Sequence, residues 1–490
     1  MNVSQDMKRQ QAAGYQMDLF EDYPNPACHG ATGDGGTESG ARAARQVSSA
    51  ADEQRALTQD LMDRVAGLAN LDEAVRRVRR NKGAAGADGM TTRDLQAWFP
   101  SHWRELQRQL LEGTYQPTAV LGVEIPKPSG GVRKLGIPTV VDRVVQQALL
   151  QTLNPLLDPT FSESSFGFRP KRSAHQALAQ ASEYVRAGRS IVVDLDLEKF
   201  FDRVNHDILM ARVARRVGDK RVLRLIRRFL EAGMMWDGVC IERHEGTPQG
   251  GPLSPLLANL LLDDLDKELE SRGHAFCRYA DDLQVYVRTR KAGERVLASV
   301  TRFIEAKLKL RVNRDKSAVA FVEERKFLGY RLLRGGKLGI APQSLKRAKD
   351  RIRQITRRNR GHVKVREMMA ELNSFLTGWV TYYRFAACKS HLQRLGEWLR
   401  RKLRCVILKR LKRTMTIAKF LRRLGVPEWR AWILALSGKG WWRMAGCPQA
   451  TEAMSLKWFA KQKLIDPVQR YEALRNQGNR RGTEQVCPVV

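Results

Sequence analysis

The sequence predicts an α+β fold with an antiparallel sheet, followed by a strongly basic, all-helical region. Up to about residue 340, short β-like runs and amphipathic helical patterns are mixed irregularly, unlike the βαβα series of a doubly wound parallel sheet. Strand-like runs stop beyond that point. Residues 341–430 then carry 25 Lys and Arg against five Asp and Glu, a net charge of +20.

The N-terminal elements follow from composition and periodicity. Residues 1–55 are rich in Gly, Ala, Ser, Gln and Asp and have almost no apolar periodicity, so we expect a disordered tail. Helical spacing begins at about residue 56, where Leu61, Val65 and Leu68 recur on one face. Glycines interrupt this pattern at 82–89, which predicts a loop.

The next elements are strands and longer helices. Two β-like runs at 120–126 and 132–137 flank a Pro-Ser-Gly-Gly turn, which predicts a hairpin. A long helix is expected through Val144–Leu153, and a buried strand over 191–196. Apolar residues at helical spacing predict an amphipathic helix over 296–308.

The most informative feature is the Tyr-Ala-Asp-Asp run at 279–282, between two apolar half-strands that predict a second hairpin. Neighbouring residues of a flat strand point to opposite faces, so Asp281 and Asp282 converge only if a tight turn bends the chain. Crowded carboxylates repel each other, and Mg²⁺ prefers such oxygen ligands. A solvated Asp-Asp turn is the alternative, because Asp is common in turns.

Overall charge and composition narrow the function classes. The chain has 490 residues and a net charge of +34, which points to a polyanionic partner such as nucleic acid. No apolar run reaches the ~18–20 residues of a membrane span, and no secretion signal is recognisable at the N-terminus. Seven scattered cysteines indicate a reducing compartment, so we expect a cytoplasmic protein without membrane partners.

A third carboxylate lies upstream of the 279–282 run. Asp194 and Asp196 are two apart and share one strand face, so either could be a ligand. The aromatic Phe201, five residues beyond Asp196, favours Asp196, whereas Phe200 is expected to pack in the core. A stiff Gly/Pro-rich loop at 246–255 precedes an apolar helix.

These segments together resemble the reverse transcriptase/maturase family encoded by group II introns. The resemblance spans about residues 60–480, and the segments in one register are far more specific than any one alone. Its segments lie at 82–89, 125–138, 166–170, 194–202, 246–255, 279–282, 326–330, 372–379 and 382–383.

The resemblance implies a metal-dependent polymerase site. Asp196, Asp281 and Asp282 match the catalytic metal-ligand triad of the family, and Leu197 would add a backbone carbonyl. Two Mg²⁺ ions about 3.5–4 Å apart would activate a primer 3′-OH and stabilise the leaving pyrophosphate. Phe201 matches the position whose ring excludes a 2′-OH and so selects deoxynucleotides.

Further residues match nucleotide and template contacts. Lys127 and Arg133 correspond to positions that bind the triphosphate of the incoming dNTP, and Gln249 to one beside its sugar. Asn313 and Lys316 match a template/primer-contacting motif. Lys316 could equally be a solvated lysine.

The resemblance implies a right-hand polymerase. Fingers and palm would occupy residues 56–340, a helical thumb and maturase domain 341–480, and a tail 481–490. We interpret the cations after residue 340 as nucleic-acid contacts. We interpret the aromatics there, Trp379, Tyr382, Tyr383, Trp398, Trp429 and Trp432, as core residues of a helical bundle.

The implied function is RNA-directed DNA synthesis coupled to binding of the parent group II intron RNA, which would promote splicing and mobility. Its partners would be that RNA, an RNA template with a DNA or RNA primer, and target DNA. The protein would lie in the bacterial cytoplasm, near the nucleoid when the intron moves. Two alternatives remain: a retron, diversity-generating or defence-associated reverse transcriptase, and a splicing-only maturase.

The chain departs from the family at two points. Glu198-Lys199 stands where many relatives carry Lys-Gly, which makes that turn less permissive. Relatives with a C-terminal nuclease domain carry His/Cys clusters beyond the last helical patch. Only Cys487 lies there, so we expect no such nuclease.

Overall fold

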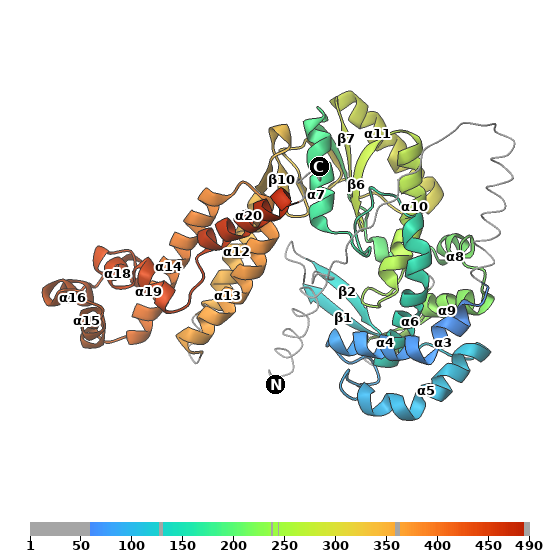
Figure 1. Ribbon diagram of the computed structural model, residues 1–490, viewed down its shortest axis with the longest axis horizontal. Coiled ribbons are helices and arrows are strands. Elements are labelled where there is room, and N and C mark those ends of the chain that lie inside the picture. Colours follow the sequence, from blue (N-terminus) through green and yellow to red (C-terminus); the bar gives the residue numbers. More distant parts are fainter. Residues whose placement is uncertain (1–58, 127–130, 237–238, 244, 358–362, 485–490) are drawn as a thin grey trace. The chain divides into compact units, whose positions relative to one another are not determined.

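The computed structural model describes residues 59–126, 131–236, 239–243, 245–357 and 363–484. They form two compact units (Figure 1). The first comprises the described residues up to 184 together with 189–320, and the second comprises 185–188 and the described residues from 321 on. The predicted tail at 1–55 and Lys127 lie outside the described residues. The predicted domain boundary at residue 340 stays a prediction.

The helices of the first unit include those expected from periodicity. The predicted N-terminal helix is divided, because Gly67 adopts an extended conformation (φ −58°, ψ 134°) between α3 and α4. Residues 82–89 form the predicted loop. The helices are α3 Leu61–Ala66, α4 Leu68–Arg80, α5 Leu95–Glu112, α6 Val140–Leu157, α7 Ala174–Arg186, α8 His206–Ala214, α9 Lys220–Glu231, α10 Ser254–Ser271 and α11 Arg290–Phe303, the last continuing as a π-helical turn over Ile304–Leu308.

One sheet of this unit has the strand order β2-β1-β4-β5. Its strands are β1 Val120–Pro126, β2 Val132–Ile137, β4 Met234–Trp236 and β5 Val239–Ile241. β1 and β2 form the predicted antiparallel hairpin. β1 also pairs in parallel with β4, a long-range pairing that the local pattern does not predict.

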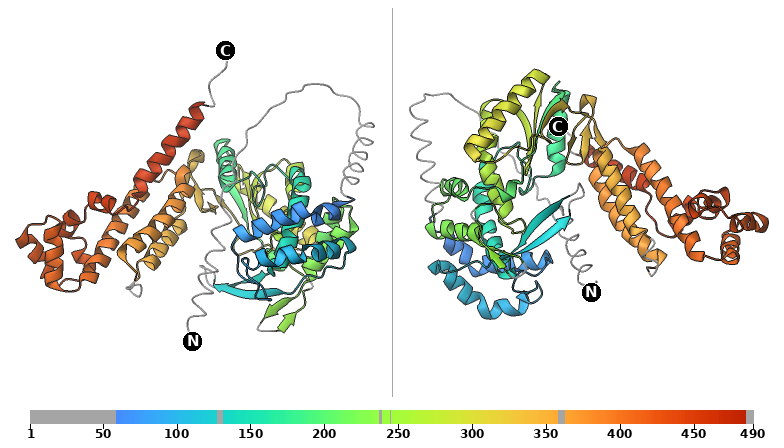
Figure 2. Two further views of the ribbon diagram at one scale, coloured as in Figure 1. Left: turned by 60° about the horizontal axis from the view of Figure 1, so that its bottom comes forward. Right: turned by 180° about the vertical axis from the view of Figure 1, so that it is seen from behind.

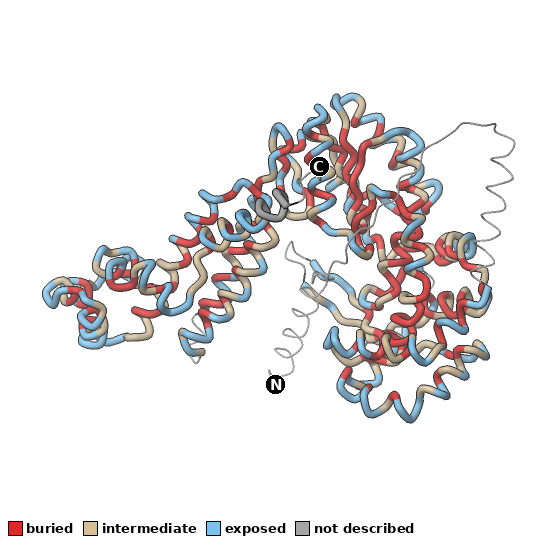
Figure 3. Tube along the Cα trace, in the orientation of Figure 1, coloured by how far each residue is buried: buried red, intermediate tan, exposed pale blue. Residues whose placement is uncertain are grey.

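The second sheet of this unit has the order β6-β7-β3-β8 and carries the aspartates. Its strands are β3 Ile191–Leu195, β6 Ala275–Tyr279, β7 Asp282–Val287 and β8 Ala318–Phe321. β7 is antiparallel to both β6 and β3, which confirms the predicted antiparallel sheet. Helices α6 and α10 are buried along most of their length (Figure 3). They share one apolar core with buried residues of β3, β6 and β7.

The second unit begins with a small sheet and is then helical. Its strands, in the order β11-β10-β9, are β9 Lys326–Phe327, β10 Tyr330–Leu332 and β11 Leu338–Ile340. Within the described residues no strand follows Ile340, as predicted, and Figure 2 shows the later segment as helices. These are α12 Pro342–Ile355, α13 Val365–Tyr382, α14 Lys389–Leu411, α15 Thr414–Arg423, α16 Glu428–Ala435, α17 Trp441–Met444, α18 Pro448–Ala453, α19 Leu456–Lys461 and α20 Pro467–Glu484.

The aromatic residues of the second unit mostly pack inward. Trp379, Trp398 and Trp432 pack against its apolar core, and Tyr383 is buried against the ring of Trp379. Trp429 is different, because it is 67% exposed on α16, so its assignment to the core was wrong. Across the described residues, no helix combines the length and apolar character that a bilayer crossing requires.

Candidate active site

The 279–282 run forms the predicted hairpin. Tyr279 pairs with Asp282, which leaves Ala280 and Asp281 as a two-residue connection between β6 and β7. Ala280 adopts a left-handed conformation (φ 58°), which tightens the turn. A Cβ at Gly167 would lie 2.2 Å from the Ala280 nitrogen, so the hairpin tip rests directly on the backbone of a segment about 110 residues earlier.

The register of the sheet brings the predicted carboxylates to one end. β3 and β7 pair up to Leu195 opposite Leu283, so Asp196 directly follows the end of β3 at the same end of the sheet where Asp282 begins β7. Asp281 lies at the adjoining tip. Burial raises its pKa, and the charge of Asp196 raises it further.

Asp194 lies deeper in the sheet than Asp196. Gln284 on β7 donates its Nε2–H to Asp194 Oδ1 at 3.1 Å. This cross-strand contact gives Asp194 a structural partner away from the sheet end. It supports the prediction that Asp196 is the ligand.

Backbone hydrogen bonds hold Asp196 in place. Its N–H donates to Ser317 Oγ at 3.0 Å, and its carbonyl accepts from the Asn313 N–H at 2.8 Å. The next residue, Leu197, forms an antiparallel bridge with Val312. The 310–316 segment, whose Asn313 and Lys316 are predicted to contact template or primer, therefore lies against Asp196 and Leu197.

The carboxylate oxygens of the aspartates suit a hard divalent cation, although they do not form a complete coordination shell. In the described part of the chain, no three His, Cys, Asp or Glu side chains are close enough together to hold a metal ion. Lys316 Nζ lies 3.4 Å from Asp196 Oδ2, and the Lys316 side chain is 68% exposed. Asp196 and Asp281 thus present hard oxygen donors that repel each other, and a divalent ion would relieve that repulsion.

Phe201 lies in a 3-10 turn, Phe200–Asp202, just after the sheet. Phe200 is buried in the core, as predicted, and its ring packs edge-on against the half-buried Phe201 ring at 5.0 Å. The Phe201 carbonyl accepts from the Thr247 N–H at 2.7 Å. Lys199 enters this turn at φ 49°, so the Glu-Lys departure places a lysine where glycine is less strained.

The 246–251 loop also connects to the β1–β2 hairpin. Arg133 Nε donates to Gln249 Oε1 at 2.6 Å, and the Gly136 N–H donates to the Gln249 carbonyl at 3.1 Å. The charge of Arg133 also acts to lower the pKa of Asp281. Two of the residues predicted to contact the nucleotide are therefore in mutual contact, and Arg133 is within electrostatic reach of Asp281.

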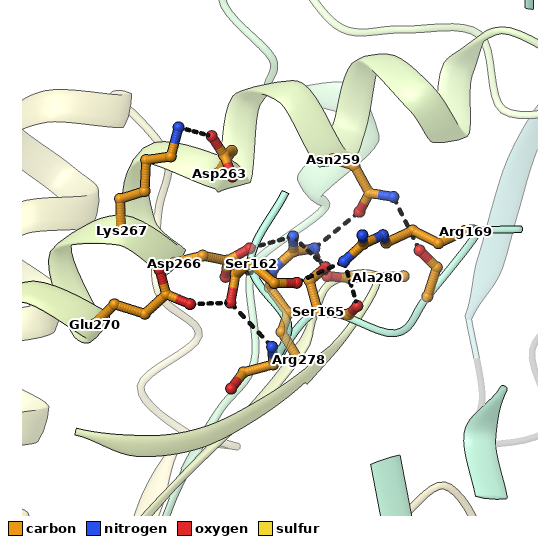
Figure 4. Close-up of polar contacts among 12 residues, drawn as sticks. Ser162, Ser165, Arg169, Asn259, Asp263, Asp266, Lys267, Glu270, Arg278 and Ala280 are labelled. Atoms are coloured by element: carbon orange, nitrogen blue, oxygen red, sulfur yellow. Dashed lines mark hydrogen bonds and ion pairs between the residues drawn. The ribbon is translucent and has the colours of Figure 1, made fainter. Parts of the chain in front are cut away.

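Sequence reasoning missed a buried polar cluster beneath the hairpin. Arg278 on β6 is 1% exposed and forms an ion pair with Asp266 of α10, which is 0% exposed (Figure 4). Asn259, also on α10, completes the cluster. The available signal was an arginine inside an otherwise apolar strand, together with carboxylates inside a Leu-rich helix, because buried charges require partners.

Comparisons with known proteins agree with this geometry. A family model described as "Reverse transcriptase (RNA-dependent DNA polymerase)" matches residues 125–332. A second, "Group II intron, maturase-specific domain", matches residues 345–425. Protein YkfC of Escherichia coli (strain K12) is 35% identical over 305 residues, which cover 54% of this chain and 80% of YkfC.

Other relatives match over shorter spans. The group II intron-encoded protein LtrA of Lactococcus lactis subsp. cremoris is 36% identical over 188 residues, which cover 38% of this chain and 31% of LtrA. Among solved structures, a partial Cas6-RT-Cas1–Cas2 complex matches with 28% identity over 51% of this chain and 43% of that chain. Its TM-score of 0.34 is too low to bear on the fold.

Proposed function

The chain belongs to the group II intron reverse transcriptase/maturase family, and we propose that it is an RNA-directed DNA polymerase that also binds its parent intron RNA. The observation that supports the proposal is the β6–β7 hairpin, which carries Asp281 and Asp282 at the end of the sheet where β3 leads into Asp196, with the charge of Asp196 acting on Asp281. In this proposal, residues 56–340 supply fingers and palm, and residues 341–480 supply the thumb and the RNA-binding maturase domain.

We assign the metal site to Asp196, Asp281, Asp282 and the carbonyl of Leu197. Divalent ions bound there would supply Lewis-acid stabilisation of the attacking and leaving oxygens. Asn313 and Ser317 hold the backbone of Asp196, and so the point from which its carboxylate would reach the metal. Lys316, beside Asp196, would keep the approaching nucleic-acid backbone close to the carboxylates.

The incoming dNTP would lie between the 246–251 loop and the β1–β2 hairpin. Arg133 is exposed, and its guanidinium would break its hydrogen bond to Gln249 in order to bind phosphate oxygens. The planar guanidinium is well suited to bidentate phosphate contacts. Lys127, outside the described residues, would add a second cation. Phe201 would lie beneath the sugar, where its ring would exclude a 2′-OH.

The second unit would bind the intron RNA. Its net positive charge suits contact with phosphates and 2′-OH groups of structured RNA, and such binding would stabilise the intron fold during splicing. The same complex would copy the intron at a DNA target. We place this activity in the bacterial cytoplasm, near the nucleoid during mobility.

Primer extension on an RNA template tests the proposal. Purified protein with Mg²⁺ and dNTPs should extend an annealed DNA primer. The genomic sequence around the reading frame should encode a catalytic intron RNA, and the protein should bind that RNA in a filter-binding assay. RNA binding without extension would instead identify a splicing-only maturase. Extension without any flanking intron would favour a retron-like or defence-associated enzyme.

A further inference from the structure

All three guanidinium nitrogens of Arg278 donate hydrogen bonds to neighbouring groups. Its Nε and Nη2 donate to the two carboxylate oxygens of Asp266 at 2.7 and 2.6 Å. Nη2 also donates to Ser165 Oγ at 2.7 Å, and Nη1 donates to Asn259 Oδ1 at 3.0 Å. A bidentate, fully satisfied pair of this kind has one allowed geometry, so the guanidinium is fixed relative to α10.

The remaining bond of the guanidinium reaches the hairpin tip. Nη1 donates to the Ala280 carbonyl at 2.9 Å (Figure 4). Ala280 is the left-handed residue of the two-residue connection, and its carbonyl belongs to the peptide group that leads into Asp281. Fixing this peptide group therefore fixes the position of the Asp281 Cα atom, from which its side chain extends.

The same cluster holds the segment on which the tip rests. Asn259 Nδ2 donates to the Gly167 carbonyl at 2.9 Å, and backbone bonds join Arg278 to Ser164 and Phe166 at 2.9 Å each. Gly167 in turn approaches the Ala280 nitrogen so closely that no side chain fits between them. The hairpin tip is thus held from one side by Arg278 and from the other by Gly167.

Arg278 and Asp281 also share a small space. Both line a cavity of about 10 Å³ whose other walls are Leu195, Leu197, Leu262, Leu265, Leu283 and Ile304. That volume is about enough for one water molecule.

We propose that Arg278 is a positioning residue that holds the Asp281 carboxylate in its metal-binding position through the Ala280 carbonyl. The inference rests on the proposed polymerase function and adds a residue outside the metal ligands. A purely structural ion pair would contribute stability alone. A positioning residue must also alter metal binding and the rate of nucleotide addition.

The matched control is Arg169, another buried arginine of the same unit. It donates to Asp158 Oδ1 at 2.8 Å and to the Ser165 carbonyl at 2.9 Å, so it anchors the same 162–169 segment. Its hydrogen bonds end on Asp158, Ser162 and Ser165 and do not reach the hairpin tip. Arg278→Lys and Arg169→Lys each keep a positive charge and lose the fork geometry, so both should lower the thermal unfolding temperature.

Three measurements on the full chain separate the two roles at a temperature where both variants are folded. For Arg278→Lys, kcat for primer extension should fall about 10- to 100-fold, as expected for a displacement near 1 Å, while KM for dNTP changes little. Its Mn²⁺ affinity, measured by electron paramagnetic resonance without substrate, should weaken. Arg169→Lys should change kcat and Mn²⁺ affinity much less, because Arg169 reaches the hairpin tip only indirectly, through the 162–169 segment.

Wild-type kcat and Mn²⁺ affinity in Arg278→Lys would overturn the proposal, and so would equal losses in Arg169→Lys. If Arg278→Lys fails to fold, Ser165→Ala loosens the guanidinium by one hydrogen bond and should lower kcat about 2- to 10-fold. An unchanged kcat in that variant would again count against positioning. An inactive wild-type protein would instead refute the polymerase function itself.

Discussion

Two buried arginines, one in each unit, have opposite kinds of partner. Arg278 in the first unit pairs with the Asp266 carboxylate. Arg404 in the second unit donates to the backbone carbonyls of Ala445 and Met454 at 2.9 and 3.2 Å. Burial lowers the pKa of Arg404, and the neighbouring charges of Arg400 and Arg401 lower it further.

The difference reflects how each unit uses positive charge. In the first unit, the buried Arg169 and Arg278 both pair with carboxylates, and Arg278 also contacts the hairpin that carries Asp281. The second unit has few carboxylates for its many cations, with five Asp and Glu against 25 Lys and Arg over residues 341–430. Such an excess of surface cations favours contact with an external anion, whereas we propose that aspartates of the first unit bind a metal ion.

The largest expected effect separates the two units. Asp281→Ala together with Asp282→Ala should lower Mg²⁺-dependent cDNA synthesis at least about 1,000-fold, because bound metal contributes several kcal/mol to the transition state. Intron RNA affinity should remain at the wild-type level. Primer extension and filter binding on one preparation measure both, and full polymerase activity would refute the metal assignment.

The next effect concerns Arg404. Arg404→Met would leave two buried carbonyls without a donor and should destabilise the second unit by about 1–3 kcal/mol. The control is Arg401→Met, whose half-buried side chain donates to the Trp442 carbonyl at 3.1 Å near the protein surface and should change stability less than Arg404→Met does. Chemical denaturation compares them. Equal stability of the two variants would show that the Arg404 bonds contribute nothing.

A smaller effect tests selectivity within the first unit. Phe201→Ala should lower the preference for dNTP over rNTP about 10- to 100-fold, the usual limit of a site that excludes a hydroxyl by shape. Phe200→Leu is the control, because Phe200 is buried in the core and should affect stability more than selectivity. Single-nucleotide incorporation rates give both ratios. An unchanged ratio in Phe201→Ala would contradict the proposed role.

The smallest effect concerns surface charge. Lys346→Gln and Arg347→Gln, at exposed positions on α12, should each weaken RNA binding modestly and reduce the slope of log affinity against log salt by up to about 1. Arg108→Gln is the control, since Arg108 lies between Glu105 and Glu112 in the first unit. Salt titrations measure the slopes. A larger change in this slope for Arg108→Gln than for Lys346→Gln would contradict the assignment of RNA binding to the second unit.

The sequence by itself determined the local features: the two hairpins, the strand ending near Asp196, the absence of strands after Ile340 among the described residues, and the excess of positive charge. Turn residues and hydrophobic periodicity act over a few residues, so they can be recognised without a structure. The exposure of Trp429 escaped this reasoning, because a tryptophan on a short helix carries no local sign of which face is covered.

Only the tertiary structure decided how distant residues meet. The pairing of β3 with β7 brings Asp196 and Asp282 to one end of the sheet, Arg133 contacts Gln249 across 116 residues, and Arg278 donates to the Ala280 carbonyl at the hairpin tip. These contacts depend on strand pairing and on the burial of α10. Neither can be predicted from residues that are neighbours in the sequence. Buried polar groups require partners, but packing alone determines which partners they find.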